Sequence, residues 1–382
     1  MNILYVCFGG AFTPGMQYKE NCMARVQQAD GNQVTIVTGT ETWNDGVVMH
    51  TVPGETILDN GVRIVRFSLH VPVFSKANEK LRYVKGLLPW IVEQKPDIIV
   101  FHILQQYAVS QLKWLKTRLP DCKIYGDCST SFGNSARNYF SYHILHRMIY
   151  RYWMKKSLPY WNKIFYVAEE SRVFLEKAYD IPQSSLEFQP LGGILLSDED
   201  YAAMRAKRRT ELGLGEDDRL YVHSGKLDAL KRTDELLRAF SSVDDPHAVL
   251  AVIGSIPKEH EAVLLPLIAA DKRIRYLGWK SGEELQEYLC AADLYCQPGS
   301  PSATMQNALC RYCPVMLYPH LSYYTADYDR GEVLWVKTQA DMEAVFRSLA
   351  ADTAQFAPLR ENAEKLAREV LDYRKLAARL YR

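Results

Sequence analysis

Short apolar runs rich in β-branched and aromatic residues recur along the chain, and longer amphipathic stretches separate most of them. Such runs are typical of strands buried on both faces, and their alternation with helices favours parallel sheets. The predicted strands are ILYVCF, QVTIVTG, RIVRFS, DIIVFHI, KIYGD and KIFYVA, followed in the second half by RLYVHSG, AVLAVIG, IRYLGW, DLYCQP, PVMLYP and VLWV. We therefore predict an α/β protein with doubly wound parallel sheets and helices on both faces.

The rhythm changes between residues 190 and 218. PLGGILLSDED leads into a charged helix, for which Ser197 is the expected N-cap, with acidic residues in the first turn. We place the domain boundary at Gly192–Gly193. Residues 1–192, with a returning C-terminal helix of about residues 366–382, are predicted to form one Rossmann-like domain and residues 193–365 the other. Two such halves are expected to face a central ligand cleft at the carboxyl ends of their strands.

Composition restricts the class of protein. The 382 residues suffice for two domains, and 48% hydrophobic with 24% charged residues is normal for a soluble globular chain. A net charge of +1 gives no global field to attract nucleic acid. No apolar run approaches the roughly 20 residues that span a bilayer, and MNILYVCF lacks the basic start of a signal peptide.

Eight cysteines are scattered too sparsely for a disulfide scaffold. Cys310 and Cys313 form a lone C-x-x-C with no second pair to complete a zinc site and no thioredoxin-like context. We interpret the cysteines as ordinary buried thiols and expect a cytoplasmic protein.

Glycines and lysines gather where predicted strands end. Gly9 and Gly10 follow the first strand and allow a ligand to approach the backbone, although G-x-G-x-x-G is absent and a simple tight turn is an equal alternative. Ser224 and Gly225 end a later strand, and Lys226 follows at once.

Lys231 comes five residues after Lys226, just before a helix. Two lysines at these places can both reach a diphosphate, although the spacing is not that of a P-loop. The alternative is a pair of solvated lysines.

Three further positions lie at strand ends. Gly254 and Ser255 end one strand, and Trp279 ends the next, where its ring can flank a nucleobase or pack as an ordinary rim residue. His102 lies near the carboxyl end of DIIVFHI. A lone histidine is more often structural, yet few structural roles place one at a strand tip facing a cleft.

The stretch PGSPSATMQNALCRYCPV, residues 298–315, follows another strand and contains no carboxylate. Its single formal charge is Arg311. Its polar side chains are hydroxyls and amides: Ser300, Ser302, Thr304, Gln306 and Asn307.

Together these junctions resemble the family 4 glycosyltransferases, which have the GT-B fold and retain anomeric configuration. The similarity covers most of the chain and is strongest in HSGKLDALKRTDELLRAF, where Lys226 and Lys231 take the places of the family's Arg and Lys that hold the donor diphosphate. NILYVCFGGAFTPG is similar to the first strand and Gly-rich loop. The resemblance implies that His102 lies near the reacting sugar.

The chain departs from the family's paired-Glu motif. When Pro314 and Val315 are matched to the family's Pro-Val, the two glutamates fall on Gly299 and Asn307. The family's first Glu contacts the donor sugar and the second accepts from the ribose hydroxyls. An amide oxygen of Gln306 or Asn307 can accept a ribose hydroxyl, with weaker bonds than a carboxylate.

Backbone N–H groups of Ser302, Ala303 and Thr304 are further candidate contacts to the donor. The two D-x-D matches, Asp198-Glu-Asp200 and Asp327-Tyr-Asp329, are interpreted as a helix start and a loop. We expect no metal and no other cofactor.

Residues 129–168 contain no acidic residue, and basic and aromatic residues alternate there. A basic aromatic helix can lie on an anionic membrane, so residues 133–163 are a hypothetical peripheral contact at the inner face of the cell membrane. The alternative is a domain helix whose aromatic residues belong to the core.

We expect a metal-independent retaining hexosyltransferase that uses a nucleotide-sugar donor and a cell-surface polysaccharide or lipid-linked acceptor. His102, Lys226 and Lys231 are the predicted catalytic residues. Two alternatives remain: a catalytically inactive binding or scaffold subunit, and a sugar-nucleotide epimerase of the same fold. Nucleic acid is not an expected partner.

Overall fold

The computed structural model describes residues 1–44, 47–69, 79–323 and 329–382. The chain divides into two compact units, Met1–Pro190 with Leu376–Arg382 (unit 1) and Leu191–Lys375 (unit 2). Residues 366–375, which we assigned to the first domain, lie in unit 2. They are held there because the Gly193 N–H donates to the Leu371 carbonyl and the Tyr373 N–H donates to the Gly193 carbonyl, each at 3.0 Å.

Unit 1 is built on a sheet with the strand order β10-β9-β8-β7-β1-β2-β6-β5, in which only β5 runs antiparallel to its neighbour. The strands are β1 (Asn2–Cys7), β2 (Gln33–Thr38), β5 (Gly54–Ile57), β6 (Arg63–Arg66), β7 (Ile98–His102), β8 (Lys123–Cys128), β9 (Lys163–Tyr166) and β10 (Leu186–Phe188). A separate hairpin consists of β3 (Glu41–Asn44) and β4 (Val47–His50). The hairpin, β5 and β10 were not predicted.

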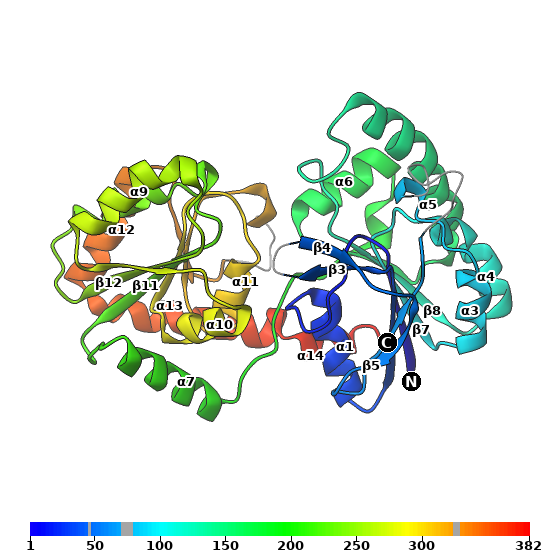
Figure 1. Ribbon diagram of the computed structural model, residues 1–382, viewed down its shortest axis with the longest axis horizontal. Helices are drawn as coiled ribbons and strands as arrows, with labels where there is room; N and C mark the ends of the chain where they lie inside the picture. Colours follow the sequence, from blue (N-terminus) through cyan, green and yellow to red (C-terminus); the bar gives the residue numbers. More distant parts are fainter. Residues whose placement is uncertain (45–46, 70–78, 324–328) are drawn as a thin grey trace. The chain divides into compact units, whose positions relative to one another are not determined.

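The helices of unit 1 cover both faces of this sheet, and Figure 1 shows α1 on one side with α3 and α4 on the other. They are α1 (Lys19–Ala29), α3 (Leu87–Gln94), α4 (Leu112–Arg118), α5 (Arg151–Ser157) and α6 (Glu169–Tyr179), with a π-helix η2 (Ser141–Tyr150) and 3-10 turns η1 (Tyr107–Gln111), η3 (Leu158–Tyr160) and η4 (Gln183–Ser185). A π-helix of this length is rare and is often associated with a functional site.

Unit 2 contains a fully parallel sheet with the order β13-β12-β11-β14-β15-β16. The strands are β11 (Arg219–Ser224), β12 (Ala248–Ile253), β13 (Ile274–Gly278), β14 (Leu294–Gln297), β15 (Val315–Leu317) and β16 (Val333–Trp335). All six correspond to predicted strands. The order reverses beside β11, so the carboxyl ends of β11 and β14 flank a topological switch point, where α/β folds bind ligands.

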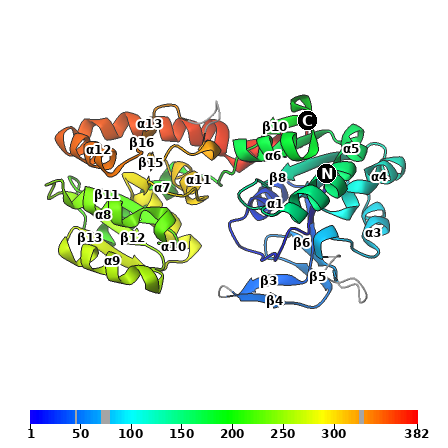
Figure 2. The same ribbon diagram turned by 90° about the horizontal axis from the view of Figure 1, so that it is seen from above.

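The helices of unit 2 also form two layers, with α9 and α12 on one face of the sheet and α7 and α10 on the other (Figure 1). They are α7 (Asp198–Glu211), α8 (Thr233–Ser241), α9 (Lys258–Ala270), α10 (Gly282–Ala291), α11 (Thr304–Leu309), α12 (Gln339–Ala351) and α13 (Phe356–Leu366), with η5 (Ala229–Lys231), η6 (Leu321–Tyr323), η7 (Thr353–Gln355) and η8 (Ala367–Leu371). The last helix, α14 (Tyr373–Ala378), passes from unit 2 into unit 1. The two sheets and their helix layers are also seen from above in Figure 2.

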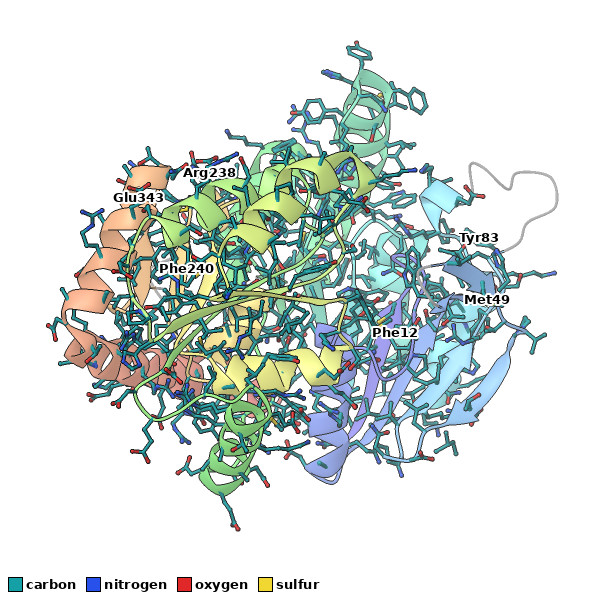
Figure 3. The ribbon with its side chains drawn as sticks, turned by 60° about the vertical axis from the view of Figure 1, so that its left-hand side comes forward. Phe12, Met49, Tyr83, Arg238, Phe240 and Glu343 are labelled. Carbon is teal, nitrogen blue, oxygen red and sulfur yellow. The ribbon has the colours of Figure 1, made fainter. Side chains whose placement is uncertain are left out.

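Amphipathic helices close the core of unit 2. Phe240 of α8 is buried and packs edge-on against Tyr221 and Phe346. Arg238 on the same helix is exposed, and Glu343 on α12 is half-buried; both are labelled in Figure 3. The apolar stripe at helical spacing is what the sequence pattern predicts. In the described part of the chain, every helix is too short or too polar to cross a bilayer.

The charged helix α7 begins as predicted, because the Ser197 hydroxyl accepts the Asp200 N–H at 3.0 Å. The helix is fixed to the sheet by one buried carboxylate. Asp293 binds Arg205, Arg209 and Arg360 and also accepts the Leu220 N–H, and despite its burial these groups lower its pKa.

Candidate functional site

Three glycines allow the carboxyl ends of β11, β12 and β14 in unit 2 to lie in direct backbone contact. A Cβ on Gly254 would stand 1.8 Å from the Gly225 carbonyl oxygen, and both residues have φ of +134°, which side chains rarely adopt. A Cβ on Gly299 would stand 2.2 Å from the Leu230 carbonyl oxygen. The turn between β11 and α8 is therefore packed backbone to backbone against the other strand ends.

Lys231 crosses this contact. A Cβ on Gly225 would lie 3.2 Å from the Lys231 Cε, so the lysine stem covers the glycine. The ammonium donates to the Ser300 carbonyl at 3.1 Å, and burial lowers the Lys231 pKa while Asp228 opposes that change. Within the described ranges Lys231 forms no ion pair, so a buried cation stands at the switch point without a bound carboxylate. Such a charge suits an anionic ligand.

Lys226 is exposed, directly after Gly225 at the end of β11. Trp279 is 74% exposed at the tip of β13, so the interpretation as a packed rim residue does not hold. Ser255 is exposed as well, whereas Ser224 is buried and its hydroxyl lies 3.2 Å from the Tyr295 hydroxyl. Of the predicted residues on these strands, Ser224 is therefore part of the supporting structure.

Residue 299 has no room for any side chain. The carboxylate that the resemblance implies at this position is therefore excluded by the backbone of Leu230 and Lys231, and not merely replaced. The Arg311 guanidinium, the single formal charge of the following stretch, donates to the Ile194 carbonyl. Residues 298–315 therefore offer a ligand neither a carboxylate nor an unengaged charged side chain.

Hydroxyls and amides occupy the next turn. The Ser302 and Thr304 hydroxyls lie 3.0 Å apart, and the Thr304 N–H donates to the Ser302 oxygen. Ala303 is exposed just before α11, and Asn307 is half-buried on the helix. The Gln306 amide oxygen is buried and has no hydrogen-bond partner among the described residues, so its acceptor capacity is unused there.

In unit 1, Gly9 and His102 lie at neighbouring strand ends. A Cβ on Gly9 would stand 2.1 Å from the Ile103 Cδ1, so glycine is needed for Ile103 to pack there. Ile103 itself has φ of +67°, a strained conformation for a β-branched residue that is often found at functional sites. Gly10 faces open space.

His102 lies between two carboxylates. Its Nδ1 is 3.0 Å from Asp127 and its Nε2 is 3.7 Å from Glu20, while Asp127 also binds Lys19 at 2.8 Å. Burial opposes the charged form of His102, but the two carboxylates outweigh it and raise its pKa to about 9. His102 is therefore a cation at neutral pH, and the 3.7 Å separation from Glu20 leaves its Nε2–H without a close acceptor in the described part of the chain.

A cavity of about 480 Å³ opens beside this cluster, at the carboxyl ends of β1, β7 and β8. Gly9 and Ile103 line it, together with residues before and within η2. A larger cavity of about 590 Å³ lies at the opposite end of β7 and β8, against Asp97 and Lys123. Ligands in α/β folds bind at the carboxyl ends of strands, so the smaller cavity is the stronger candidate.

The basic aromatic segment, residues 133–163, divides between core and surface. Tyr150 and Met154 are buried, whereas Tyr139, Phe140, Met148 and Tyr152 are between 61% and 77% exposed. Asp180, outside the segment, pairs with its bases Arg147, Arg151 and Lys155. The segment is thus less basic than its sequence alone indicates.

Comparison with known proteins identifies this architecture. Residues 204–369 match the family described as Glycosyl transferases group 1, which covers most of unit 2 and all of its glycine and lysine cluster. No curated protein sequence matches the chain significantly.

Solved structures are similar over nearly the whole chain. HepE of Anabaena in complex with UDP and glucose has a TM-score of 0.61 at 13% identity, covering 100% of this chain and 98% of that one. Sucrose-phosphate synthase of Thermosynechococcus elongatus has 0.66 at 14% identity, covering 100% and 97%. WaaG, a glycosyltransferase involved in lipopolysaccharide biosynthesis, has 0.60 at 17% identity, covering 99% and 98%.

These likenesses show the predicted fold, the GT-B arrangement of two Rossmann-like domains. The activity comes from the family match in unit 2: the protein is a glycosyltransferase.

Sequence reasoning missed several residues of the site. Lys19, Glu20 and Asp127, which hold His102, come from α1 and the end of β8 and carry no motif. Their one signal is position, because Asp127 ends a predicted strand and the other two begin the helix after the first Gly-rich loop.

Proposed function

We propose that the protein transfers a sugar, with retention of configuration and without a metal ion, from a nucleoside-diphosphate sugar to a cell-surface polysaccharide or lipid-linked acceptor. The observation that carries this proposal is Lys231, a buried cation without an ion pair in the described chain, placed over Gly225 at the switch point of unit 2. HepE, of similar fold, binds UDP, which supports a nucleotide donor.

The lysines supply the electrostatic part of the reaction. As the bond between the anomeric carbon and the diphosphate breaks, negative charge develops on the leaving phosphate oxygens. Cations already in place stabilise that charge, and burial strengthens their effect. Lys231 acts from the buried side of the turn, and Lys226 acts from the exposed side.

The remaining predicted residues have distinct proposed roles. The ribose hydroxyls donate to Asn307 and to the unpartnered Gln306 oxygen, and the exposed Trp279 ring covers the base. In unit 1, the charged His102 donates its Nε2–H to the transferring sugar.

Binding of nucleotides tests the proposal most directly. Titration calorimetry with UDP, GDP and ADP should show one that binds, and Lys231→Met should weaken it by about tenfold or more, because a charge-assisted bond to phosphate is lost. Lys272→Met, which removes an exposed lysine elsewhere in unit 2, is the matched control and should bind as the wild type does. Equal loss in both variants would contradict the assignment.

The steric exclusion at Gly299 favours one alternative, a binding or scaffold subunit without catalysis. The protein has no carboxylate at position 299 to contact a donor sugar, although the resemblance implies one there. An assay of nucleotide-sugar hydrolysis separates the enzyme from the scaffold. It uses the sugar of the nucleotide that binds and measures the nucleoside diphosphate released over several hours. Tight nucleotide binding with no release, even with added acceptor lipids, would favour the scaffold.

We further propose that the exposed apolar residues of the basic aromatic segment contact an anionic membrane, which would suit a lipid-linked acceptor. Tyr139, Phe140 and Met148 are the residues to insert, and the bases beyond the reach of Asp180 add the electrostatic attraction. Tyr139→Ser with Phe140→Ser should abolish pelleting with phosphatidylserine vesicles. Val263→Ser with Leu265→Ser, exposed apolar residues of unit 2, should not. Pelleting that is independent of anionic lipid would refute the contact.

A further inference from the structure

The cavity at the carboxyl end of the unit 1 sheet is positively charged. Among the described residues that line it there is no aspartate or glutamate, whereas Lys80 and Arg82 are both present. Its volume of about 480 Å³ falls within the roughly 300–1,000 Å³ of small-molecule sites. Most of its other lining side chains are amides and hydroxyls, which suit a sugar.

Arg82 is fixed in the wall of this cavity, and it has no counter-ion among the described residues. Its backbone has φ of +48°, a strained conformation, and its Nη1 donates to the Gln105 carbonyl at 2.6 Å. The Tyr150 hydroxyl also hydrogen-bonds to it. No carboxylate in the described chain pairs with it. A guanidinium has five N–H donors in a planar fork, so several remain for a ligand.

A chain of hydrogen bonds behind the cavity fixes one further donor. The Thr130 hydroxyl donates to the Gln105 amide oxygen at 3.3 Å, and the Gln105 amide nitrogen donates to the Tyr179 oxygen at 2.8 Å. The Tyr179 hydroxyl is thereby left to donate to His146 Nδ1, 2.7 Å away.

Burial and the charge of Arg82 lower the His146 pKa to about 4, so the ring is neutral at pH 7. Because its Nδ1 accepts from Tyr179, we assign the one ring proton to Nε2. That proton points to the Ser135 oxygen at 3.0 Å. Since this oxygen accepts from His146, the Ser135 hydroxyl hydrogen is free to point into the cavity. The cavity therefore presents donors, from Arg82 and Ser135, and its described lining contains no carboxylate to repel an anion.

We propose that this cavity binds a sugar that carries an oxyanion, either a phosphate or a carboxylate, with the anion on Arg82 and Ser135. The inference rests on the proposed glycosyltransferase function, for which it gives the acceptor its chemical class: a sugar phosphate, such as the first sugar of a diphosphate-linked lipid, or an acidic sugar of a polysaccharide.

Binding to the full-length protein tests the inference without activity. Glucose 1-phosphate and glucuronate represent the two anions, and glucose is the neutral probe. We expect at least one anionic probe to bind about tenfold or more tightly than glucose, and inorganic phosphate to compete with it. Arg82→Leu should remove this preference. Arg118→Leu, in the cavity at the opposite end of the sheet, should keep it.

Two further variants guard against misfolding. Arg82→Lys keeps the charge but loses the planar fork, so we expect partial loss of affinity, and Ser135→Ala removes one hydroxyl at the cavity with little effect on packing. Equal affinity for glucose and both anionic probes, or a preference that survives Arg82→Lys and Ser135→Ala unchanged, would overturn the inference.

Nucleotide binding by the same variants keeps the two proposals apart. UDP, GDP and ADP should bind Arg82→Leu as they bind the wild type, because Lys231 and its surroundings lie in unit 2. If a sugar phosphate binds in an Arg82-dependent way but no nucleotide binds, the cavity assignment is supported and the proposed nucleotide-sugar donor is refuted. If a nucleotide binds but anionic sugars are not preferred, the donor proposal is supported and the cavity assignment is refuted.

Discussion

The charge of His102 offers a direct test of the unit 1 cluster. Its pKa rises from 6.5 to about 9 although burial acts in the opposite direction, so the carboxylates of Glu20 and Asp127 must raise the pKa by more than this net difference. A rise of this size corresponds to about 3 kcal/mol of preference for the imidazolium over the neutral ring. His102 should therefore stay charged well above the pH at which an ordinary histidine loses its proton.

An NMR titration of the imidazole C–H signals from pH 5.5 to 10 measures this directly. His102→Gln identifies the signal by its disappearance, and Glu20→Gln should move the midpoint down by about one unit or more because one of the two carboxylates is neutralised. A wild-type midpoint at or below 6.5 would refute the argument, since it would mean that burial outweighs both carboxylates.

The same pKa has a consequence for stability. Because the folded pKa is above the unfolded value of 6.5, the stabilisation is complete below pH 6.5 and is lost as pH rises towards 9. The difference in free energy of unfolding between the wild type and His102→Gln should therefore shrink by about 3 kcal/mol between pH 6 and pH 9.5, as followed by urea unfolding. A difference that is constant across this range would contradict the linkage.

Three other expectations concern single residues. Gly254→Ala should destabilise unit 2 by about 3 kcal/mol or more in thermal unfolding, because its Cβ would overlap the Gly225 carbonyl at positive φ, and a wild-type melting temperature would refute the backbone contact. Asp293→Asn should lower the free energy of unfolding by about 3–5 kcal/mol, because three arginines lose their carboxylate partner. Titration calorimetry should show an unchanged nucleotide affinity. The His146 pKa is lowered to about 4, so the free energy of unfolding should fall as pH falls from 6.5 to 4, because the unfolded state binds the proton more tightly. The same pH dependence in His146→Gln would contradict this assignment.

Most of the fold was predictable from the sequence because its strands are buried on both faces and so form continuous apolar runs. The strands that were missed lack this signal. β4 and β5 are exposed along their whole length, and β10 has three residues, of which one is buried. Their pairing depends on neighbouring strands that the local sequence does not reveal.

The candidate site was predictable only in part, for a similar reason. Lys231 and Gly225 lie close together in the chain, and their spacing matches a motif. Arg82 and Asp127 become site residues only because the fold brings separate segments to one sheet edge. The absence of a carboxylate at Gly299 was visible in the sequence, but its steric cause is a contact with a turn about 70 residues earlier.

The backbone contact of Gly225, Gly254 and Gly299 also offers a criterion for recognising relatives. A search for paired glutamates would pass over any chain built like this one, whereas glycine at these three strand ends follows from the packing of peptide groups. A chain with all three glycines and a lysine six residues after the first has the same interlocked turn, and its donor pocket must then operate without the first carboxylate. The three glycines thus define a subgroup whose backbone excludes the first carboxylate. Members of this subgroup can be counted in sequence surveys without knowledge of the donor.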